Sequence, residues 1–255
     1  MGGARTLRAK LTLRLSALTK ISEHVYWLPP GPPDRPSLCA VVGERRTMML
    51  DAGSSDAHAR IVLDGLTAAG APPPSLVALT HWHWDHVFGA AEIGAPVLAH
   101  RETAAKLIEQ AETDWSDEAL DRRVAEGLDS EQHAANVKEE LRSPRKVEMA
   151  PADVVFDQEL DVELGGVTVR VTHVDGDHAS DSCVMYVEPD RVLFLGDCLY
   201  ELLSGGYTAE RTLPLHEAIL AFGAETFVEG HHEKATGRAE LDEYLAEIRA
   251  AVEAV

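Results

Sequence analysis

Short apolar runs and longer amphipathic stretches alternate along the whole chain. Runs rich in Val, Leu and Met that are bounded by turn residues predict strands. In the first half we expect strands at 11–15, 24–28, 38–42, 47–50, 76–80 and 96–99. A helix is expected over 56–69, because Gly70 and the run Pro72–Pro74 end its pattern. The first half therefore predicts a sheet with one helix between its fourth and fifth strands.

The second half repeats this order of strands followed by helices. We expect strands at 167–172, 183–187, 192–195 and 226–229, and a helix over 215–221. A last helix is predicted to be capped by Thr236. One of its faces carries an apolar stripe of Leu241, Leu245, Ile248 and Val252. Two similar halves without a long linker predict an α/β fold, with one domain over 1–255 that contains two stacked sheets flanked by helices.

Residues 101–150, between the two halves, have helical patterns with little strand character. The segment is rich in Asp and Glu, and we expect it to form a helical cover inserted into the domain. Two interpretations stay open at this point. The acidic helices form either a solvated surface, or a lid over a site or a contact between the subunits of a homodimer.

Composition and charge restrict the partners. The 255 residues include 43 acidic residues and 23 Lys or Arg, which gives a formal charge of −20. Such a surface repels phosphate backbones, so we expect no nucleic-acid partner. Apolar runs are too short to span a membrane, so we expect no membrane partner. The three cysteines, Cys39, Cys183 and Cys198, are too few for a disulfide framework and favour a reducing, cytoplasmic compartment.

The densest group of chemically active residues is the segment His81-Trp82-His83-Trp84-Asp85-His86. It directly follows the strand predicted at 76–80. Because residues i and i+2 of an extended chain point the same way, His81 and His83 can bind one metal ion. Once the chain turns toward a helix, Asp85 and His86 leave that line and can reach a second ion. The two tryptophans either fill the core around the motif or line a substrate opening.

Four more candidate residues stand where apolar strands end, namely Asp51, His178, Asp197 and His231. Strand ends on one side of a sheet assemble sites from distant parts of a sequence. His173 and His232 are weaker rivals for the histidines beside them. Asp175 and Asp177 either form a solvated turn or support the metal ligands.

These residues and their order resemble the metallo-β-lactamase-fold hydrolase superfamily, from Asp51 to His231. The resemblance implies an αββα four-layer sandwich with two ions at one edge, usually zinc, although iron or manganese suits the same ligands. By motif position it implies a first ion bound by His81, His83 and His178, a second bound by Asp85, His86 and His231, and a bridge by Asp197. It also implies that Asp51 orients the ligands.

The chemistry expected of such a site is hydrolysis of a small-molecule substrate. Two cations that share a water lower its pKa from about 15.7 toward 7 and produce a metal-bridged hydroxide, which would attack a lactone, ester or thioester carbonyl. Asp85 would orient this hydroxide, and Asp85 or Asp197 would pass the proton to the leaving group. Tyr200 resembles a phenol that contacts the substrate carbonyl in some quorum-quenching lactonases; the alternative is a packed aromatic. Cys198 is expected to be a buried thiol.

Known relatives narrow the expected activity. The commonest zinc β-lactamases carry Cys where this chain has Asp197, which disfavours penicillin hydrolysis as the main activity. Glyoxalase II-like thioesterases append a helical domain, whereas only residues 232–255 follow His231 here. A lactonase-like or esterase-like hydrolase is therefore the leading expectation. The alternatives are a mononuclear iron oxygenase of sulfur substrates with a similar motif, a β-lactamase-like amide hydrolase, and a metal-binding scaffold without turnover.

Overall fold

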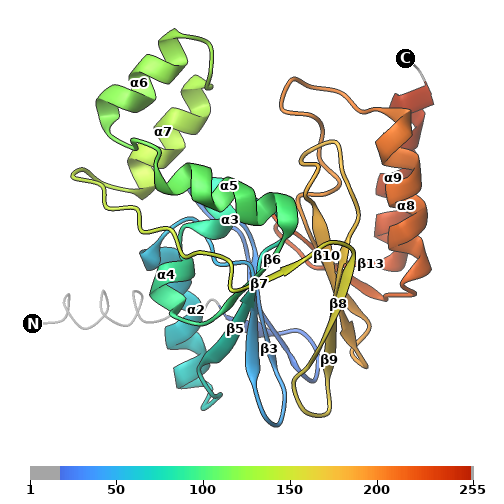
Figure 1. Ribbon diagram of the computed structural model, residues 1–255. Helices are drawn as coiled ribbons and strands as arrows, with labels where there is room; N and C mark the ends of the chain where they lie inside the picture. The colour runs from blue at the N-terminus through green and yellow to red at the C-terminus, as the bar shows by residue number, and fades with distance from the viewer. Residues whose placement is uncertain (1–17, 254–255) are drawn as a thin grey trace, which may run out of the picture.

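The computed structural model describes residues 18–253 of the chain. Two β-sheets lie face to face, and helices cover the outer face of each sheet, so that the layers follow the order helix, sheet, sheet, helix (Figure 1). This arrangement confirms the expected αββα sandwich. The strand expected at 11–15 lies outside the described residues.

The first sheet runs in the order of the sequence. Its strands are β1 (Thr19–Lys20), β2 (Val25–Leu28), β3 (Leu38–Val42), β4 (Thr47–Leu50), β5 (Pro74–Ala78), β6 (Val97–His100) and β7 (Val154–Phe156). The strands from β1 to β4 pair antiparallel, and those from β4 to β7 pair parallel. Each residue of β4 is buried, as expected for a strand covered on both faces.

The second sheet is mainly antiparallel. In spatial order its strands are β13 (Thr236–Gly237), β12 (Thr226–Glu229), β11 (Val192–Gly196), β10 (Cys183–Glu188), β9 (Thr168–His173) and β8 (Glu159–Glu163). Only the pair β11 and β12 is parallel among these strands. Each sheet therefore contains parallel strands that end at the same edge, namely β4 to β7 in the first sheet and β11 with β12 in the second.

Helices occupy the outer layers and the segment between the sheets. They are α2 (Asp56–Ala68), α3 (Trp84–Val87), α4 (Ala90–Ile93), α5 (Arg101–Ala111), α6 (Asp117–Ala125), α7 (Glu131–Glu140), α8 (Ala209–Ala221) and α9 (Arg238–Glu253). The start of α2 is fixed by Ser55, whose hydroxyl accepts a hydrogen bond from the His58 backbone N–H at 3.1 Å. Helices α2 and α4 lie on the first sheet, and α8 and α9 lie on the second (Figure 1).

The core is divided by the two sheets into three apolar layers. Between the sheets, Leu50 of the first packs in one cluster with Met185 and Phe194 of the second. The outer clusters join α2 to the first sheet and α8 with α9 to the second. The stripe predicted for the last helix is confirmed, because Leu241, Leu245, Ile248 and Val252 are all buried.

The predicted cover consists of α5, α6 and α7. In Figure 1, α6 and α7 rise above the helix layer of the first sheet. Their buried Leu120 and Val137 belong to the same apolar cluster as Leu107 of α5 and the outer face of the first sheet. The cover therefore packs on the core by one face and exposes its acidic face to solvent.

Most predicted boundaries lie within two residues of the observed ones, but two expectations were wrong and some strands were missed. Helix α8 begins at Ala209 rather than at 215, and Pro214 lies inside it. Thr236 belongs to β13 and does not cap α9, which begins at Arg238. Strands β7 and β8 were not predicted, because β7 has only three residues and β8 is mostly exposed and lacks an apolar run. Among the helices of residues 18–253, none is long and apolar enough to cross a membrane.

The contact between the sheets predicts a large effect on stability. Phe194 is fully buried there, and its replacement by Ala should lower the free energy of unfolding by about 3–5 kcal/mol because a cavity remains. Leu203 is 77% exposed, and Leu203→Ala should change the free energy of unfolding by less than about 0.5 kcal/mol. Urea unfolding of both variants measures the difference. A loss below about 1 kcal/mol for Phe194→Ala would contradict this packing.

Candidate metal centre

The candidate ligands gather at the edge where the parallel pairs of both sheets end. Asp51 directly follows β4, and the segment from His81 to His86 follows β5. In the second sheet Asp197 follows β11, and His231 follows β12 after Gly230. Because parallel neighbours end at the same side of a sheet, these residues meet although they are far apart in the sequence.

The first group of ligands consists of His81, His83 and His178, whose ligand atoms lie within 4.8 Å of one another. Nδ1 of His83 lies 2.9 Å from Nε2 of His178. Burial lowers the pKa of His81 well below its usual value, and burial first and His178 second lower that of His83 to about 3. Both imidazoles are therefore neutral at pH 7 and offer nitrogen lone pairs to a cation.

The second group consists of Asp85, His86, Asp197 and His231, again with ligand atoms within 4.8 Å of one another. Nε2 of His231 lies 3.1 Å from Oδ2 of Asp85, and Nε2 of His86 lies 3.2 Å from Oδ2 of Asp197. These four side chains come from α3 and from the ends of β11 and β12. The structure thus brings all seven sequence-predicted ligands into two adjacent groups.

Asp197 faces both groups with one oxygen. Its Oδ2 lies 3.2 Å from Nε2 of His86 and 3.4 Å from Nε2 of His231. The same oxygen lies 3.4 Å from Nε2 of His178 and 4.0 Å from Nε2 of His81, both in the first group. A carboxylate in this place can contact two cations at once.

Asp51 supports the second group from behind. Its carboxylate accepts hydrogen bonds from the Thr80 backbone N–H at 2.7 Å and from the Thr80 hydroxyl at 2.8 Å. Its Oδ2 also lies 2.7 Å from Nδ1 of His86, which leaves Nε2 of that ring directed at Asp197. The backbone of Asp51 is in the left-handed region, with φ of 61°. The expected orienting role therefore agrees with its contacts.

The charges of the site fit a divalent cation. Asp51, Asp85 and Asp197 are buried, and none of them pairs with Lys or Arg among the described ion pairs. Although burial opposes it, Asp197 and Asp85 raise the pKa of His231 to about 10, so an imidazolium would balance charge where no cation is bound. Three buried atoms of the ligands, Nε2 of His81, Nδ1 of His178 and Oδ1 of Asp197, have no hydrogen-bond partner. Neutral imidazole and carboxylate donors of this kind suit zinc.

The two remaining reactive candidates lie beside Asp197. The Tyr200 hydroxyl accepts a hydrogen bond from the His231 backbone N–H at 3.0 Å, and its ring lies 5.9 Å from that of His178. Burial, reinforced by Asp197, raises the pKa of Tyr200, so the phenol keeps its proton. Burial also raises the pKa of the Cys198 thiol well above its usual value, which agrees with the expected inert side chain.

The structure separates the rival residues from the site. His173 stacks on His100 with ring centroids 4.1 Å apart, and the exposed His232 contacts the Lys234 carbonyl. Asp177 accepts hydrogen bonds from Thr208 and Thr212 and so fastens the segment before α8. Asp175 lies beside Arg211, at 3.7 Å.

The two tryptophans of the motif differ in their surroundings. Trp84 is buried and packs edge-on against Phe88, as expected for a core residue. Trp82 is only half-buried, and Lys106 lies over its ring. Trp82 therefore lies at the surface near the first group rather than in the core.

One residue near the site was missed by sequence reasoning. Oδ1 of Asp34 lies 3.7 Å from Nδ1 of His231. Asp34 lies in a Pro-rich connection between β2 and β3 and has no metal-ligand spacing around it. The long connection itself, between two strands that pair with each other, is the only sequence signal that could have drawn attention to it.

The comparisons with known proteins agree with this geometry. The model of the metallo-beta-lactamase superfamily matches residues 32–245. A metallo-beta-lactamase from Pontibacter korlensis is similar in structure, with a TM-score of 0.65 at 20% identity over 91% of this chain and 98% of that chain. One from Hirschia baltica has a TM-score of 0.61 at 16% identity over 90% and 95% of the two chains.

A third solved structure has another activity in its name. A double mutant of the sec-alkyl sulfatase PisA1 has a TM-score of 0.67 at 15% identity, and the match covers 93% of this chain but 42% of that chain. No curated protein matches the chain. These structural likenesses establish the fold, and the family match extends over most of the sequence. This chain therefore belongs to the metallo-beta-lactamase superfamily, most of whose members are metal-dependent hydrolases.

Proposed function

We propose that this chain is a hydrolase that binds two zinc ions and cleaves a small lactone, ester or thioester. The observation that carries the proposal is the pair of adjacent ligand groups, which face the shared carboxylate of Asp197. A single group would suit one ion, as the iron oxygenase alternative requires. Two groups that each contain histidines suit a dinuclear hydrolase better.

The ligands divide between the ions as the sequence motif implies. The first ion would be held by His81, His83 and His178, the second by Asp85, His86 and His231, and both by Asp197. When bound, two such ions lower the pKa of a shared water toward 7 and polarise a substrate carbonyl, which is the chemistry needed for hydrolysis. Asp51 and Thr80 keep His86 in the orientation that this binding needs.

Two residues of the chain would act on the substrate side. Asp85 has Oδ2 3.1 Å from His231 and 3.4 Å from His86, so its carboxylate stands inside the second group and can accept a proton from a neighbouring water. The Tyr200 oxygen already accepts a backbone hydrogen bond, and its O–H remains free to donate. We propose that this O–H stabilises the carbonyl oxygen of the substrate as negative charge develops on it.

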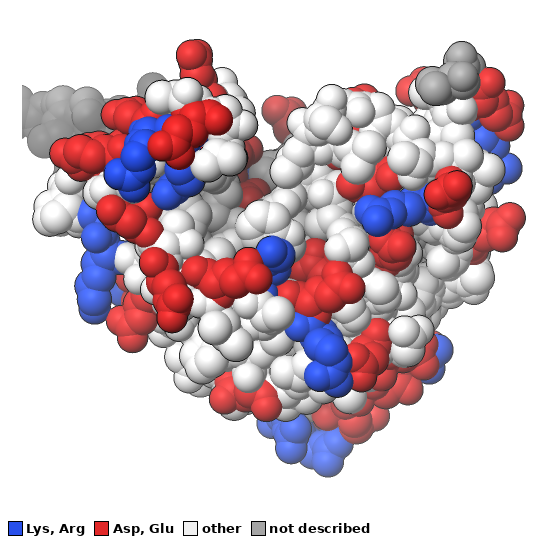
Figure 2. Space-filling model, turned by 45° about the horizontal axis from the view of Figure 1, so that its top comes forward, with Lys and Arg blue, Asp and Glu red and all other residues white. Residues whose placement is uncertain are grey.

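The surrounding charges support a neutral or cationic substrate. Two basic residues near the ligand-bearing segments are paired with acids, Arg35 with Glu140 at 2.9 Å and Lys106 with Glu109 at 2.8 Å. Figure 2 shows several groups of acidic side chains on one face, with basic side chains beside many of them and uncharged residues over much of the rest. A β-lactam carboxylate or an alkyl sulfate would be repelled by the formal charge of −20. A carbonyl substrate without a negative group avoids that repulsion.

The experiment that tests the function combines metal analysis with a substrate screen on one purified sample. We expect close to two zinc ions per chain, with turnover of lactones, esters or thioesters that stops when a chelator removes the metal. A cephalosporin and a secondary alkyl sulfate serve as comparison substrates. One iron per chain together with oxygen uptake on a sulfur substrate would replace this proposal by the oxygenase alternative.

Removing the Asp85 carboxylate should abolish most of the activity. We expect Asp85→Ala to lower kcat by about 10²–10⁴-fold, because both a ligand and a proton acceptor are lost. Circular dichroism should show that the fold persists. Asp64→Ala, on the exposed face of α2, is the control and should retain the wild-type rate. An unchanged rate in Asp85→Ala would reject the mechanism.

The shared carboxylate also depends on a glycine. A Cβ atom built on Gly230 would lie 1.9 Å from Oδ1 of Asp197, closer than any nonbonded contact allows. The glycine therefore leaves the space in which the carboxylate stands between the two groups. By contrast, a Cβ atom on Gly237, in the same sheet, would meet nothing within 4 Å.

This contrast gives a matched pair of variants. Gly230→Ala should displace Asp197 and lower metal affinity and activity by about 10–100-fold, the range seen when a supporting position of a metal site is altered. Gly237→Ala should leave both unchanged. Metal content after dialysis and initial rates measure the effect. Equal behaviour of the two alanine variants would show that the position of Asp197 does not matter.

A further inference from the structure

Asp34 stands behind the His231 ring, on the side opposite the second ligand group. Its Oδ1 lies 3.7 Å from Nδ1 of His231, whereas Nε2 of the same ring lies 3.1 Å from Oδ2 of Asp85. The ring thus has one nitrogen toward the ligands and the other toward Asp34. A distance of 3.7 Å is longer than a direct hydrogen bond, so Asp34 acts on the ring as a nearby charge or through one water.

The connection that carries Asp34 is fastened at both sides of the residue. Gly31 and Arg35 exchange two backbone hydrogen bonds, at 2.9 and 2.8 Å, which close a tight turn around Asp34. The Ser37 backbone N–H donates to the carbonyl of Gly230, the residue before His231. The turn and the ligand are therefore linked through the backbone as well as through the side chains.

Helix α7 of the cover holds the Asp34 carboxylate in place. The Asn136 side-chain amide donates a hydrogen bond to Oδ2 of Asp34 at 2.9 Å. Asn136 is only 8% exposed, and its own oxygen accepts a hydrogen bond from Gln132 at 2.8 Å. With its oxygen occupied in this way, the amide presents its N–H to Asp34.

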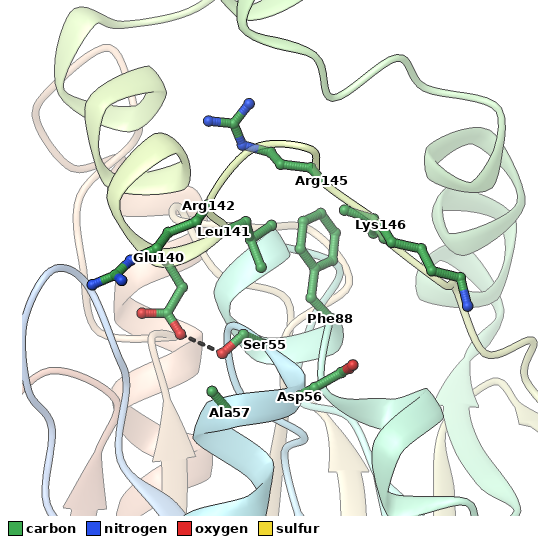
Figure 3. Close-up of a pocket in the computed structure, with 10 residues that line it drawn as sticks. Ser55, Asp56, Ala57, Phe88, Glu140, Leu141, Arg142, Arg145 and Lys146 are labelled. Carbon is green, nitrogen blue, oxygen red and sulfur yellow. Dashed lines mark hydrogen bonds between the residues drawn. The ribbon is translucent and has the colours of Figure 1, made fainter.

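A second contact ties the end of α7 to the same connection. The Glu140 side chain is 1% exposed and accepts two hydrogen bonds from Nε of Arg35, at 2.9 and 3.1 Å. It also accepts a hydrogen bond from the Ser55 hydroxyl, at the start of α2 (Figure 3). Ser55 and Glu140 are among the residues that line a cavity of about 200 Å³. Helix α7 thus contacts the connection at two adjacent residues, Asp34 through Asn136 and Arg35 through Glu140.

The same arrangement already occurs at the other histidine of the second group. Nδ1 of His86 has Asp51 at 2.7 Å, and its Nε2 is directed at Asp197. A carboxylate behind a ligating histidine fixes its tautomer and its ring orientation and makes it a stronger ligand. Each histidine of the second group therefore has one carboxylate behind it, Asp51 from the first sheet and Asp34 from the connection braced by α7.

We propose that Asp34 is a positioning residue for His231 and that Asn136 of the helical cover holds it there. The inference rests on the proposed metal centre, and it assigns a role to the inserted segment. In this proposal Asn136 of the cover holds Asp34, Asp34 orients His231, and His231 binds the second ion. Neither Asp34 nor Asn136 needs to touch the substrate for this role.

Cobalt(II) is the probe for the test, because its visible absorption reports its ligands. Metal-free protein is titrated with cobalt(II), and His231→Ala identifies the step that belongs to the second group. Asp34→Ala should weaken that step by about 10–100-fold and leave the step of the first group unchanged. Asp34→Asn keeps an acceptor oxygen and should recover part of the affinity. Glu233→Gln removes an exposed charge two residues from His231 and should bind cobalt as the wild type does.

The role of Asn136 is tested by a double-mutant cycle. Asn136→Ala should weaken the second step less than Asp34→Ala, and the double variant should be no weaker than Asp34→Ala alone, because both changes act through one contact. Additive losses, equal losses at both steps, or an unchanged second step would overturn the proposal. So would a change in KM alone, which would assign Asp34 to substrate binding. A wild-type protein that binds no cobalt would instead contradict the proposed metal centre itself.

Discussion

Burial of negative charge at one edge of the sandwich is the constraint on which the rest of the site depends. Three carboxylates, Asp51, Asp85 and Asp197, are at most 6% exposed. An ion that leaves water loses several kcal/mol of solvation unless opposite charge or hydrogen bonds replace it. Imidazoles and one threonine are their described side-chain partners, and neutral imidazoles supply no charge. The proposed divalent cation in each ligand group would balance the carboxylates and leave the imidazoles neutral.

The backbone around this charge is unusual at the strand ends. Asp51 and Gly196 both have positive φ, of 61° and 53°, directly beside the ligands. Such conformations persist only where the surroundings determine them, and here the Thr80 contacts fix Asp51 in place. A Cβ atom on Gly196 would lie 2.8 Å from the Thr80 side chain, so the close approach of the two segments there requires a residue without a side chain. The positive φ of Asp51 and the missing side chain of Gly196 thus both allow the chain to pack closely around Thr80.

The sequence was most informative where chemistry or burial leaves a dense pattern. His81, His83, Asp85 and His86 are close in sequence, so their spacing predicted two ligands for each ion, and the family resemblance added His178, Asp197 and His231. The buried apolar strands were predicted nearly to the residue. Strand β8 was missed because its exposed face carries acids instead of an apolar run. Asp34 and Asn136 stand 102 residues apart. Neither belongs to a motif, so only the folded chain, which packs α7 against the connection after β2, brings them together.

The buried negative charge also explains why an amide, rather than a cationic side chain, suits position 136. A lysine there would pair with Asp34, neutralise it, and place a positive charge near the second ligand group, where it would repel a metal ion. An amide donates a hydrogen bond without adding charge, so Asp34 keeps its negative charge toward His231. Several basic side chains of the cover are instead paired with acids, as Lys138 with Asp121 and Arg145 with Asp117. An acidic cover is therefore compatible with the proposed cation site, because the amide that contacts Asp34 adds no positive charge near the ligands.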